Sequence, residues 1–152
     1  MNFKEYVYDK FIFKVKNEIY YHKDGCWIEK MEGVAVVGVT DFFQTLNGDT
    51  ASVSLFGIGV KVKQGAPIGD IETMKVSFEL TSPVSGEVIE HNKLLDNSPE
   101  LINLDPYGDG WLLRVKLDDF GIDKINLMDS KSYFDFMKLK VEEEGEKFKS
   151  GQ

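Results

Sequence analysis

The sequence predicts a mainly β protein, built as a flattened antiparallel barrel-sandwich. Apolar residues mostly alternate with other residues along positions 26–116, a pattern typical of strands with one buried face. Glycines interrupt this region at short intervals, where tight turns require a residue without a side chain. Many short strands separated by glycine turns favour a barrel or sandwich over a parallel α/β sheet.

Residues 1–17 form a predicted N-terminal extension with an ambiguous apolar pattern. The spacing of Tyr6, Val7 and Phe11 and the alternation of Phe13 and Val15 together fit a helix followed by a strand.

The middle of the chain contains several predicted strands and one hairpin. Two apolar arms lead to Lys75 and away from it, which places residues 73–76 at a hairpin tip. Gly65 and Gly86 are expected in turns with positive φ. The other predicted strands are residues 34–39, 50–55, 59–62 and 86–89.

A short helix is predicted near residues 40–47. Thr40 is a suitable N-cap, Asp41 is favourable at the positive end of the helix, and Gly48 ends it.

A second helix is predicted near residues 130–144, capped by Asp129 or Ser130. We expect its apolar stripe to lie on the sheet, and Gly145 to end it. Residues 145–152 are expected to form a disordered tail. The stripe consists of Tyr133, Phe134, Met137 and Val141.

The composition is that of one globular domain, because 152 residues and 42% hydrophobic content suffice for a single core. The 18 basic and 26 acidic residues give a net charge of −8, which disfavours nucleic-acid and membrane partners. No apolar run is long enough for a membrane span, and the first residues fit a signal or transit peptide poorly.

The few cysteines and histidines disfavour disulfides and metal binding. Cys26 is the only cysteine, which fits a reducing compartment, so we expect a cytoplasmic protein. His22 and His91 lack the spacing of metal ligands and are expected at the surface. Nucleotide-binding and hydrolase motifs are also missing from the sequence.

Lys75 is the residue most suited to chemistry. A lysine at a hairpin tip projects its amine away from the sheet on a four-carbon stem, where a modifying enzyme reaches it. The acids Glu72 and Glu79 flank it in a pattern that such an enzyme could recognise. Alone, the same lysine is also consistent with an ordinary surface residue.

The surroundings of Lys75 resemble the lipoyl/biotinyl carrier family, and residues 18–144 resemble the H protein of the glycine cleavage system. A carrier lysine of this family follows Glu-Ser/Thr-x and precedes a Ser-Pro-Val-Ser-Gly-Glu-Val strand. The matching segments here are Glu72-Thr73-Met74-Lys75, residues 82–88, Val37-Gly38-Val39-Thr40-Asp41, residues 99–111, and Leu127-Met128-Asp129 with Tyr133. The string Asp105-Pro106-Tyr107-Gly108-Asp109-Gly110-Trp111 is specific to H proteins and is missing from simple lipoyl and biotinyl domains.

The resemblance implies a lipoyl-domain-like barrel-sandwich hybrid that carries lipoate covalently on Lys75 and has no catalytic activity. Glu72, Thr73 and Met74 would form the attachment turn, and Glu79 would contact an amine cargo. The implied partners are a lipoate ligase or a lipoyl/octanoyl transferase, glycine decarboxylase, aminomethyltransferase and dihydrolipoamide dehydrogenase. We expect a monomer.

Two departures from the family pattern leave alternatives open. The family's His and Glu positions before Trp27 hold Gly25 and Cys26, and its Glu-Leu-Pro-Glu-Val-Gly segment is residues 54–59 here. The resemblance places these positions where an H protein shelters its loaded arm. An H-like lipoate carrier of another system, such as heterodisulfide-reductase-like sulfur oxidation, is therefore an alternative.

Two further alternatives use the same fold. Met74-Lys75-Val76 is half of the Met-Lys-Met signature of biotin carriers, but residues 99–111 weigh against biotin. The other alternative is an unmodified binding module that docks a partner through its acidic face.

Overall fold

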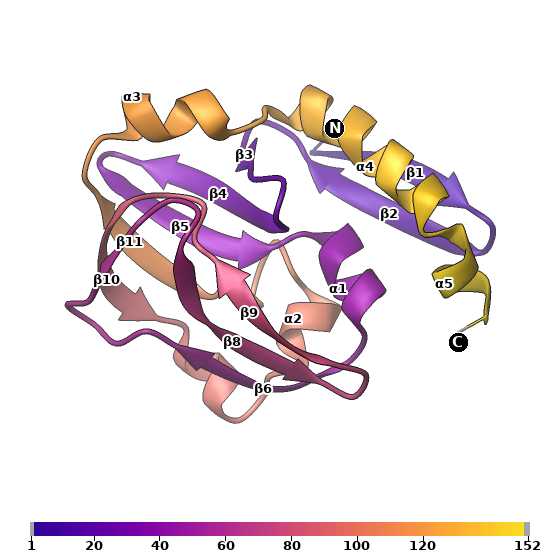
Figure 1. Ribbon diagram of the computed structural model, residues 1–152, viewed down its shortest axis with the longest axis horizontal. Helices are drawn as coiled ribbons and strands as arrows, with labels where there is room; N and C mark the ends of the chain where they lie inside the picture. Colours follow the sequence, from indigo (N-terminus) through magenta and orange to yellow (C-terminus); the bar gives the residue numbers. More distant parts are fainter. Residues whose placement is uncertain (1, 151–152) are drawn as a thin grey trace.

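The strands form three antiparallel sheets in the computed structural model, which describes residues 2–150 (Figure 1). A six-stranded sheet has the order β3-β4-β5-β11-β10-β7, a three-stranded sheet β6-β8-β9, and a two-stranded sheet β1-β2. The strands are β1 (Phe3–Tyr8), β2 (Phe11–Lys16), β3 (Tyr20–Tyr21), β4 (Cys26–Met31), β5 (Val34–Val39), β6 (Thr50–Leu55), β7 (Lys61–Val62), β8 (Pro67–Thr73), β9 (Ser77–Thr81), β10 (Gly86–His91) and β11 (Leu113–Leu117).

Short helices join the strands, and a longer one follows them. They are α1 (Asp41–Asn47), the 3-10 helix η1 (Lys93–Asp96), α2 (Leu101–Leu104), α3 (Phe120–Asp123), the 3-10 helix η2 (Lys124–Asn126), α4 (Ser130–Glu143) and α5 (Gly145–Ser150). Among the described helices, none is both long enough and apolar enough to cross a membrane.

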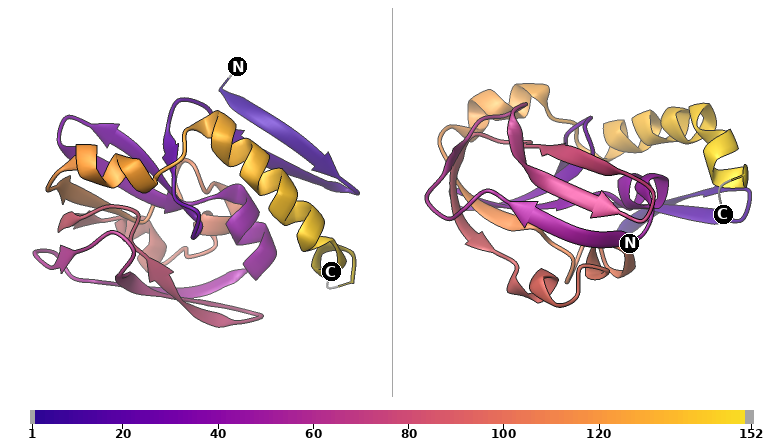
Figure 2. Two further views of the ribbon diagram at one scale, coloured as in Figure 1. Left: turned by 45° about the horizontal axis from the view of Figure 1, so that its top comes forward. Right: turned by 60° about the horizontal axis from the view of Figure 1, so that its bottom comes forward.

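The main core lies between the six-stranded and three-stranded sheets, which face each other (Figure 2). Val37 and Val115 of the larger sheet and Ile71 and Leu80 of the smaller sheet belong to this core and are almost completely buried. Burying such side chains contributes roughly 1.5–3 kcal/mol each, so this layer accounts for much of the fold's stability.

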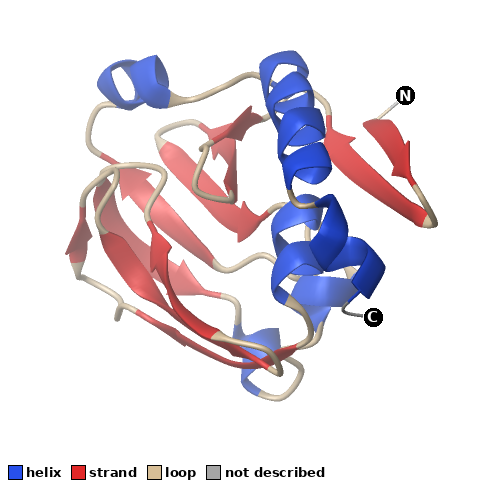
Figure 3. Cartoon of the chain, turned by 45° about the vertical axis from the view of Figure 1, so that its right-hand side comes forward, coloured by secondary structure: helices blue, strands red, loops and turns tan. Residues whose placement is uncertain are grey.

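A second core covers the other face of β4 and β5. The β1-β2 hairpin, α1, α4 and α5 lie together on one side of the molecule (Figure 3), and Trp27 and Val36 point into the aromatic cluster between them. Their strand neighbours Ile28 and Val37 point into the main core. Because both faces of β5 are covered, its sequence is a continuous apolar run rather than an alternating one.

Both predicted helices are confirmed, with their N-caps. The Thr40 hydroxyl accepts a hydrogen bond from the Phe43 amide at 3.1 Å, and α1 ends at Gly48, where φ is 90°. Asp129 caps α4 by accepting from the Ser132 amide at 2.8 Å. The expectation that Gly145 ends the second helix was wrong, because α4 ends at Glu143 with Glu144 as its C-cap and Gly145 begins α5.

The expectation for the N-terminal extension was wrong, because its residues form a hairpin of two strands and no helix within 2–16. Tyr6 pairs with Phe13 and Tyr8 with Phe11, while Asp9 adopts a positive φ of 55° in the turn between the strands. The two-residue turn reverses the chain before a helical turn can form. Residue 1 lies outside the described residues.

The expectation of a disordered tail was also wrong for residues 145–150, which form α5. Phe148 is 1% exposed and packs against the rings of Phe11, Phe13 and Phe42. The aromatic cluster thus holds the end of the chain in place through Phe148, which the many charged residues of this segment did not lead us to expect. Residues 151 and 152 of that tail lie outside the described residues.

The expectation of positive φ is confirmed for Gly65 and wrong for Gly86. Gly65 has a φ of +87° and open space around it. Gly86 begins β10 without a positive φ, and a Cβ there would lie 2.0 Å from the Lys116 carbonyl oxygen. Glycine is needed at position 86 because β11 approaches closely, not because of a turn.

Candidate functional site

The tip of the β8-β9 hairpin carries Lys75 at the surface, as the sequence predicted. Ile71 pairs with Phe78 and Glu72 with Ser77, and residues 74–76 join the two strands. Lys75 is exposed, and Met74 beside it is 78% exposed. The amine of Lys75 is therefore accessible from solvent.

Thr73 points into the protein and organises the turn. Its Oγ1 accepts hydrogen bonds from the amides of Lys75 at 3.1 Å and Val76 at 3.0 Å, and it donates to the Asn47 carbonyl at 2.7 Å. Thr73 is buried, so it supports the turn from within and presents no surface to an enzyme.

The hairpin tip also caps the C-terminal end of α1. The last carbonyls of a helix lack hydrogen-bond donors within the helix, and here two of them accept hydrogen bonds from the hairpin. The Lys75 Nζ donates to the Leu46 carbonyl at 3.3 Å, and the Thr73 hydroxyl donates to the Asn47 carbonyl. The last turn of α1 contains no basic residue, so Lys75 supplies the cation that favours the negative end of the helix dipole.

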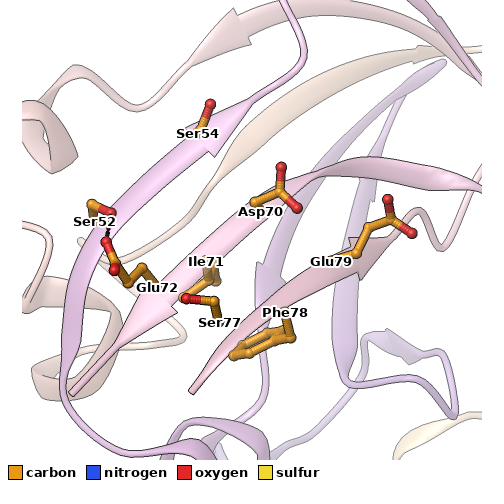
Figure 4. Close-up of a pocket in the computed structure, with 8 residues that line it drawn as sticks. All are labelled: Ser52, Ser54, Asp70, Ile71, Glu72, Ser77, Phe78 and Glu79. Carbon is orange, nitrogen blue, oxygen red and sulfur yellow. Dashed lines mark hydrogen bonds between the residues drawn. The ribbon is translucent and has the colours of Figure 1, made fainter. Parts of the chain in front are cut away.

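An open depression of about 540 Å³ lies beside the hairpin tip on the outer face of the β6-β8-β9 sheet (Figure 4). Asp70 pairs across the strands with both Ser54 and Glu79, which places two carboxylates directly opposite each other. Glu72 accepts a hydrogen bond from the Ser52 hydroxyl at 3.1 Å. The lining residues are Ser52, Ser54, Asp70, Ile71, Glu72, Ser77, Phe78 and Glu79.

Aromatic packing occupies the region of Gly25 and Cys26. A Cβ at Gly25 would lie 2.2 Å from Cδ1 of Phe43, whose ring meets Phe78 edge-on at 5.3 Å. Cys26 is 1% exposed, and burial raises the pKa of its thiol to about 12. These side chains offer packing surface and no ionised group.

His22 is buried, which corrects the expectation of a surface histidine. Its Nδ1 accepts from the Asp24 amide at 3.1 Å in the turn before β4, and the imidazole is 6% exposed. Within residues 2–150, no cluster of three or more His, Cys, Asp or Glu side chains could hold a metal ion.

Sequence reasoning found part of the site and missed the rest. Lys75, Met74, Glu72 and Glu79 share the outer surface, whereas Thr73 does not. Asp70 was missed, although its i, i+2 spacing to Glu72 on one strand places both on the same face.

Asn103 was also missed. It lies 28 residues from Lys75 in the sequence, and only the fold brings α2 to the end of α1. The one available signal was its place inside the family-like string of residues 99–111.

The chain is similar to H proteins of the glycine cleavage system. The family model "Glycine cleavage H-protein" matches residues 19–140. A probable glycine cleavage system H protein of Pyrococcus abyssi is 42% identical over 127 residues, which cover 83% of this chain and 94% of that protein. The glycine cleavage system H protein of Aeromonas hydrophila is 42% identical over 120 residues, covering 78% and 92%.

A solved structure is similar as well. The crystal structure of a glycine cleavage system H protein from Mycobacterium marinum matches with a TM-score of 0.68 and 28% identity, covering 78% of this chain and 95% of that one. This confirms the predicted mainly β fold class.

Among the alternatives raised by the sequence, these similarities favour the glycine cleavage interpretation. The proteins of this family are carriers without catalytic activity, and they bear lipoate on a lysine. They work as one component of the glycine cleavage system. The chain belongs to the glycine cleavage H-protein family.

Proposed function

We propose that Lys75 is the lipoyl attachment site of this carrier. The observation that supports this most directly is the exposed amine at a hairpin tip whose turn is held from within by Thr73. An acyl-transferring enzyme needs an accessible amine on a defined backbone, and the tip of β8-β9 supplies both. The lipoyl group fits here because its amide would extend the Lys75 side chain into solvent without displacing a buried group.

Attachment is an acyl transfer to the Lys75 amine. The amine loses its proton and attacks the carbonyl carbon of a lipoyl adenylate, which a ligase makes from lipoate and ATP. The amide bond forms as AMP leaves. An octanoyl or lipoyl transferase would supply the acyl group from a thioester instead, with the thiol as leaving group.

Once attached, the lipoyl group supplies the disulfide that accepts an aminomethyl group. The chain itself presents this arm to three partners in turn: glycine decarboxylase, aminomethyltransferase and dihydrolipoamide dehydrogenase. We propose that it does so as a cytoplasmic monomer. The net charge of −8 would speed encounters with partners that expose basic surfaces.

Glu72 and Glu79 have separate proposed roles. Glu72 lies one residue before the end of β8, close to the attachment turn, and is exposed, so a ligase can recognise it together with Met74. Glu79 is exposed on the neighbouring strand, where its carboxylate would accept a hydrogen bond from a protonated amine cargo. We expect Glu72→Ala to slow attachment, and Glu79→Gln to weaken retention of the cargo without slowing attachment.

The test of the attachment site is lipoylation of the purified protein by a lipoate ligase, followed by peptide mass mapping. We expect one lipoyl group, on Lys75, and complete loss of labelling in Lys75→Arg, because a guanidinium is essentially never deprotonated. The exposed position limits the stability change to about 0.5 kcal/mol. Protein isolated from its native host should carry the same mass increment.

The controls are other exposed lysines of the same acidic domain. Lys61→Arg, Lys63→Arg and Lys93→Arg should each take up label at the wild-type rate. Label on a lysine other than Lys75 would refute the site. An unmodified protein from a lipoate-replete host would support the unmodified binding module instead.

A further inference from the structure

The backbone carbonyls of the four residues 46–49, at and just after the end of α1, all accept hydrogen bonds from either the hairpin tip or Asn103. Those of Leu46, Asn47 and Asp49 accept from Lys75 Nζ, the Thr73 hydroxyl and the Met74 amide, at 3.3, 2.7 and 2.9 Å. The remaining one, that of Gly48, accepts from Asn103 Nδ2 at 2.9 Å. The segment that holds the lysine turn is thus held in its middle by Asn103.

Asn103 uses its whole amide for this purpose. Besides Gly48, Nδ2 donates to Gln44 Oε1 on α1 at 3.0 Å, and Oδ1 accepts from the Thr50 amide at the start of β6 at 2.9 Å. One side chain therefore joins the last turn of α1, the loop after it and the first residue of β6. None of these three hydrogen bonds of the Asn103 side chain goes to Lys75, so its influence on the lysine passes through this loop.

We infer that Asn103 is a positioning residue for acyl transfer to Lys75. This rests on the proposed function of Lys75. Transfer requires the amine to reach the activated carbonyl in a narrow range of geometries, and small displacements of a reacting group are costly. Loss of Asn103 releases the 47–50 loop, and the Thr73 and Met74 contacts lose their fixed partners.

The experiment compares ligase kinetics of the unmodified full-length wild type and Asn103→Ala, with lipoate and ATP. We expect kcat/KM to fall about tenfold, mainly through kcat, because Glu72 and Met74 still offer the docking surface. Amide hydrogen exchange supplies a second readout that does not depend on the enzyme. The Met74 amide should exchange faster in Asn103→Ala, since its acceptor Asp49 lies in the released loop.

The matched control lies next to Asn103 on the same short helix. Ile102 is 1% exposed in the main core, so Ile102→Val and Ile102→Ala lower the melting temperature without removing a hydrogen bond from the loop. The Ile102 variant whose melting temperature is nearer to that of Asn103→Ala serves as the control. It should keep the wild-type kcat and the wild-type Met74 exchange under conditions where all the proteins are folded.

The outcomes separate the two claims. If wild type is labelled on Lys75 and Asn103→Ala is labelled at the same rate, the inference about Asn103 is refuted and the function of Lys75 stands. An equal loss of kcat in an Ile102 variant of matched stability would likewise reduce Asn103 to a structural residue. If Lys75 of the wild type takes no label, the proposed function fails and the inference fails with it.

Discussion

At the scale of single residues, Thr73 shows how one hydroxyl supports a functional turn. Removing it in Thr73→Val leaves the amides of Lys75 and Val76 without their acceptor, and the Asn47 carbonyl without its donor. We expect the free energy of unfolding to fall by about 1–3 kcal/mol. Thr73→Ser keeps the hydroxyl and should lose less than about 1 kcal/mol. Urea unfolding measures both, and equal stability of the two variants would contradict this role.

Gly86 and Gly65 are glycines for different reasons: Gly86 lacks space for a side chain, and Gly65 has a positive φ. Gly86→Ala should destabilise the protein by more than about 1 kcal/mol, because the new Cβ meets the backbone of β11 at a distance no real contact tolerates. Gly65→Asn should cost less than about 1 kcal/mol, since asparagine adopts positive φ and nothing lies near it. Thermal unfolding of both decides the matter; an unchanged melting temperature in Gly86→Ala would mean that β10 moves aside.

At this scale the sequence predicted Lys75 as the attachment residue, but it did not reveal the side chains that support the turn. Lys75 stands in a local string that resembles the attachment turn of lipoyl carriers, and this resemblance singled it out from other surface lysines. Thr73 was expected in the turn, but its inward orientation depends on the register of β8. The supporting position of Asn103 depends on which helix end lies nearby, which follows from packing of the whole chain.

At the scale of elements, α5 offers a test of the second core. Phe148→Ala should lower the free energy of unfolding by about 3 kcal/mol, because it removes a buried ring from the aromatic cluster. Leu139→Ala on α4 is the matched control: Leu139 is 63% exposed, so its loss should change stability by about 0.5 kcal/mol or less. Similar stabilities for the two variants would show that α5 is not bound in solution.

The N-terminal hairpin explains why the extension was hard to predict. Its inward residues, such as Tyr6 and Phe13, pack on α4 and α5, elements more than 110 residues away in the sequence. The hairpin is also fixed by hydroxyls from the rest of the chain. The Lys14 carbonyl accepts from Tyr107 at 2.9 Å, and the Lys16 carbonyl accepts from Tyr21 at 2.6 Å. The apolar periodicity of the N-terminal extension itself contains no information about these distant partners.

At the scale of the whole molecule, His22 couples stability to pH. Burial lowers the pKa of His22 below its ordinary value of 6.5, although Asp24 partly opposes the shift. Below pH 6.5 the unfolded chain therefore binds a proton that the folded state resists, and stability falls as the pH is lowered through the folded pKa. We expect His22→Gln to show a shallower loss than wild type between pH 7 and pH 5, measured by urea unfolding. Parallel curves would contradict this.

The reactivity of Cys26 reports on the whole fold. Because burial raises its pKa to about 12, the thiol should resist iodoacetamide at pH 8 in the folded protein. Its labelling rate should follow global unfolding and increase with urea in step with loss of the folded state. Rapid labelling in native buffer would instead mean that β4 opens on its own.

The bond between Lys75 and the Leu46 carbonyl also concerns the entropy of the arm. A lysine side chain has about 2 kcal/mol of rotamer entropy, and the unmodified protein gives up part of it by holding the ammonium at the end of α1. Acylation turns the ammonium into a neutral amide, which removes the attraction to the helix end and makes the net charge −9 instead of −8. We expect that attachment of the prosthetic group lengthens the arm and also sets it free to search the space around the hairpin.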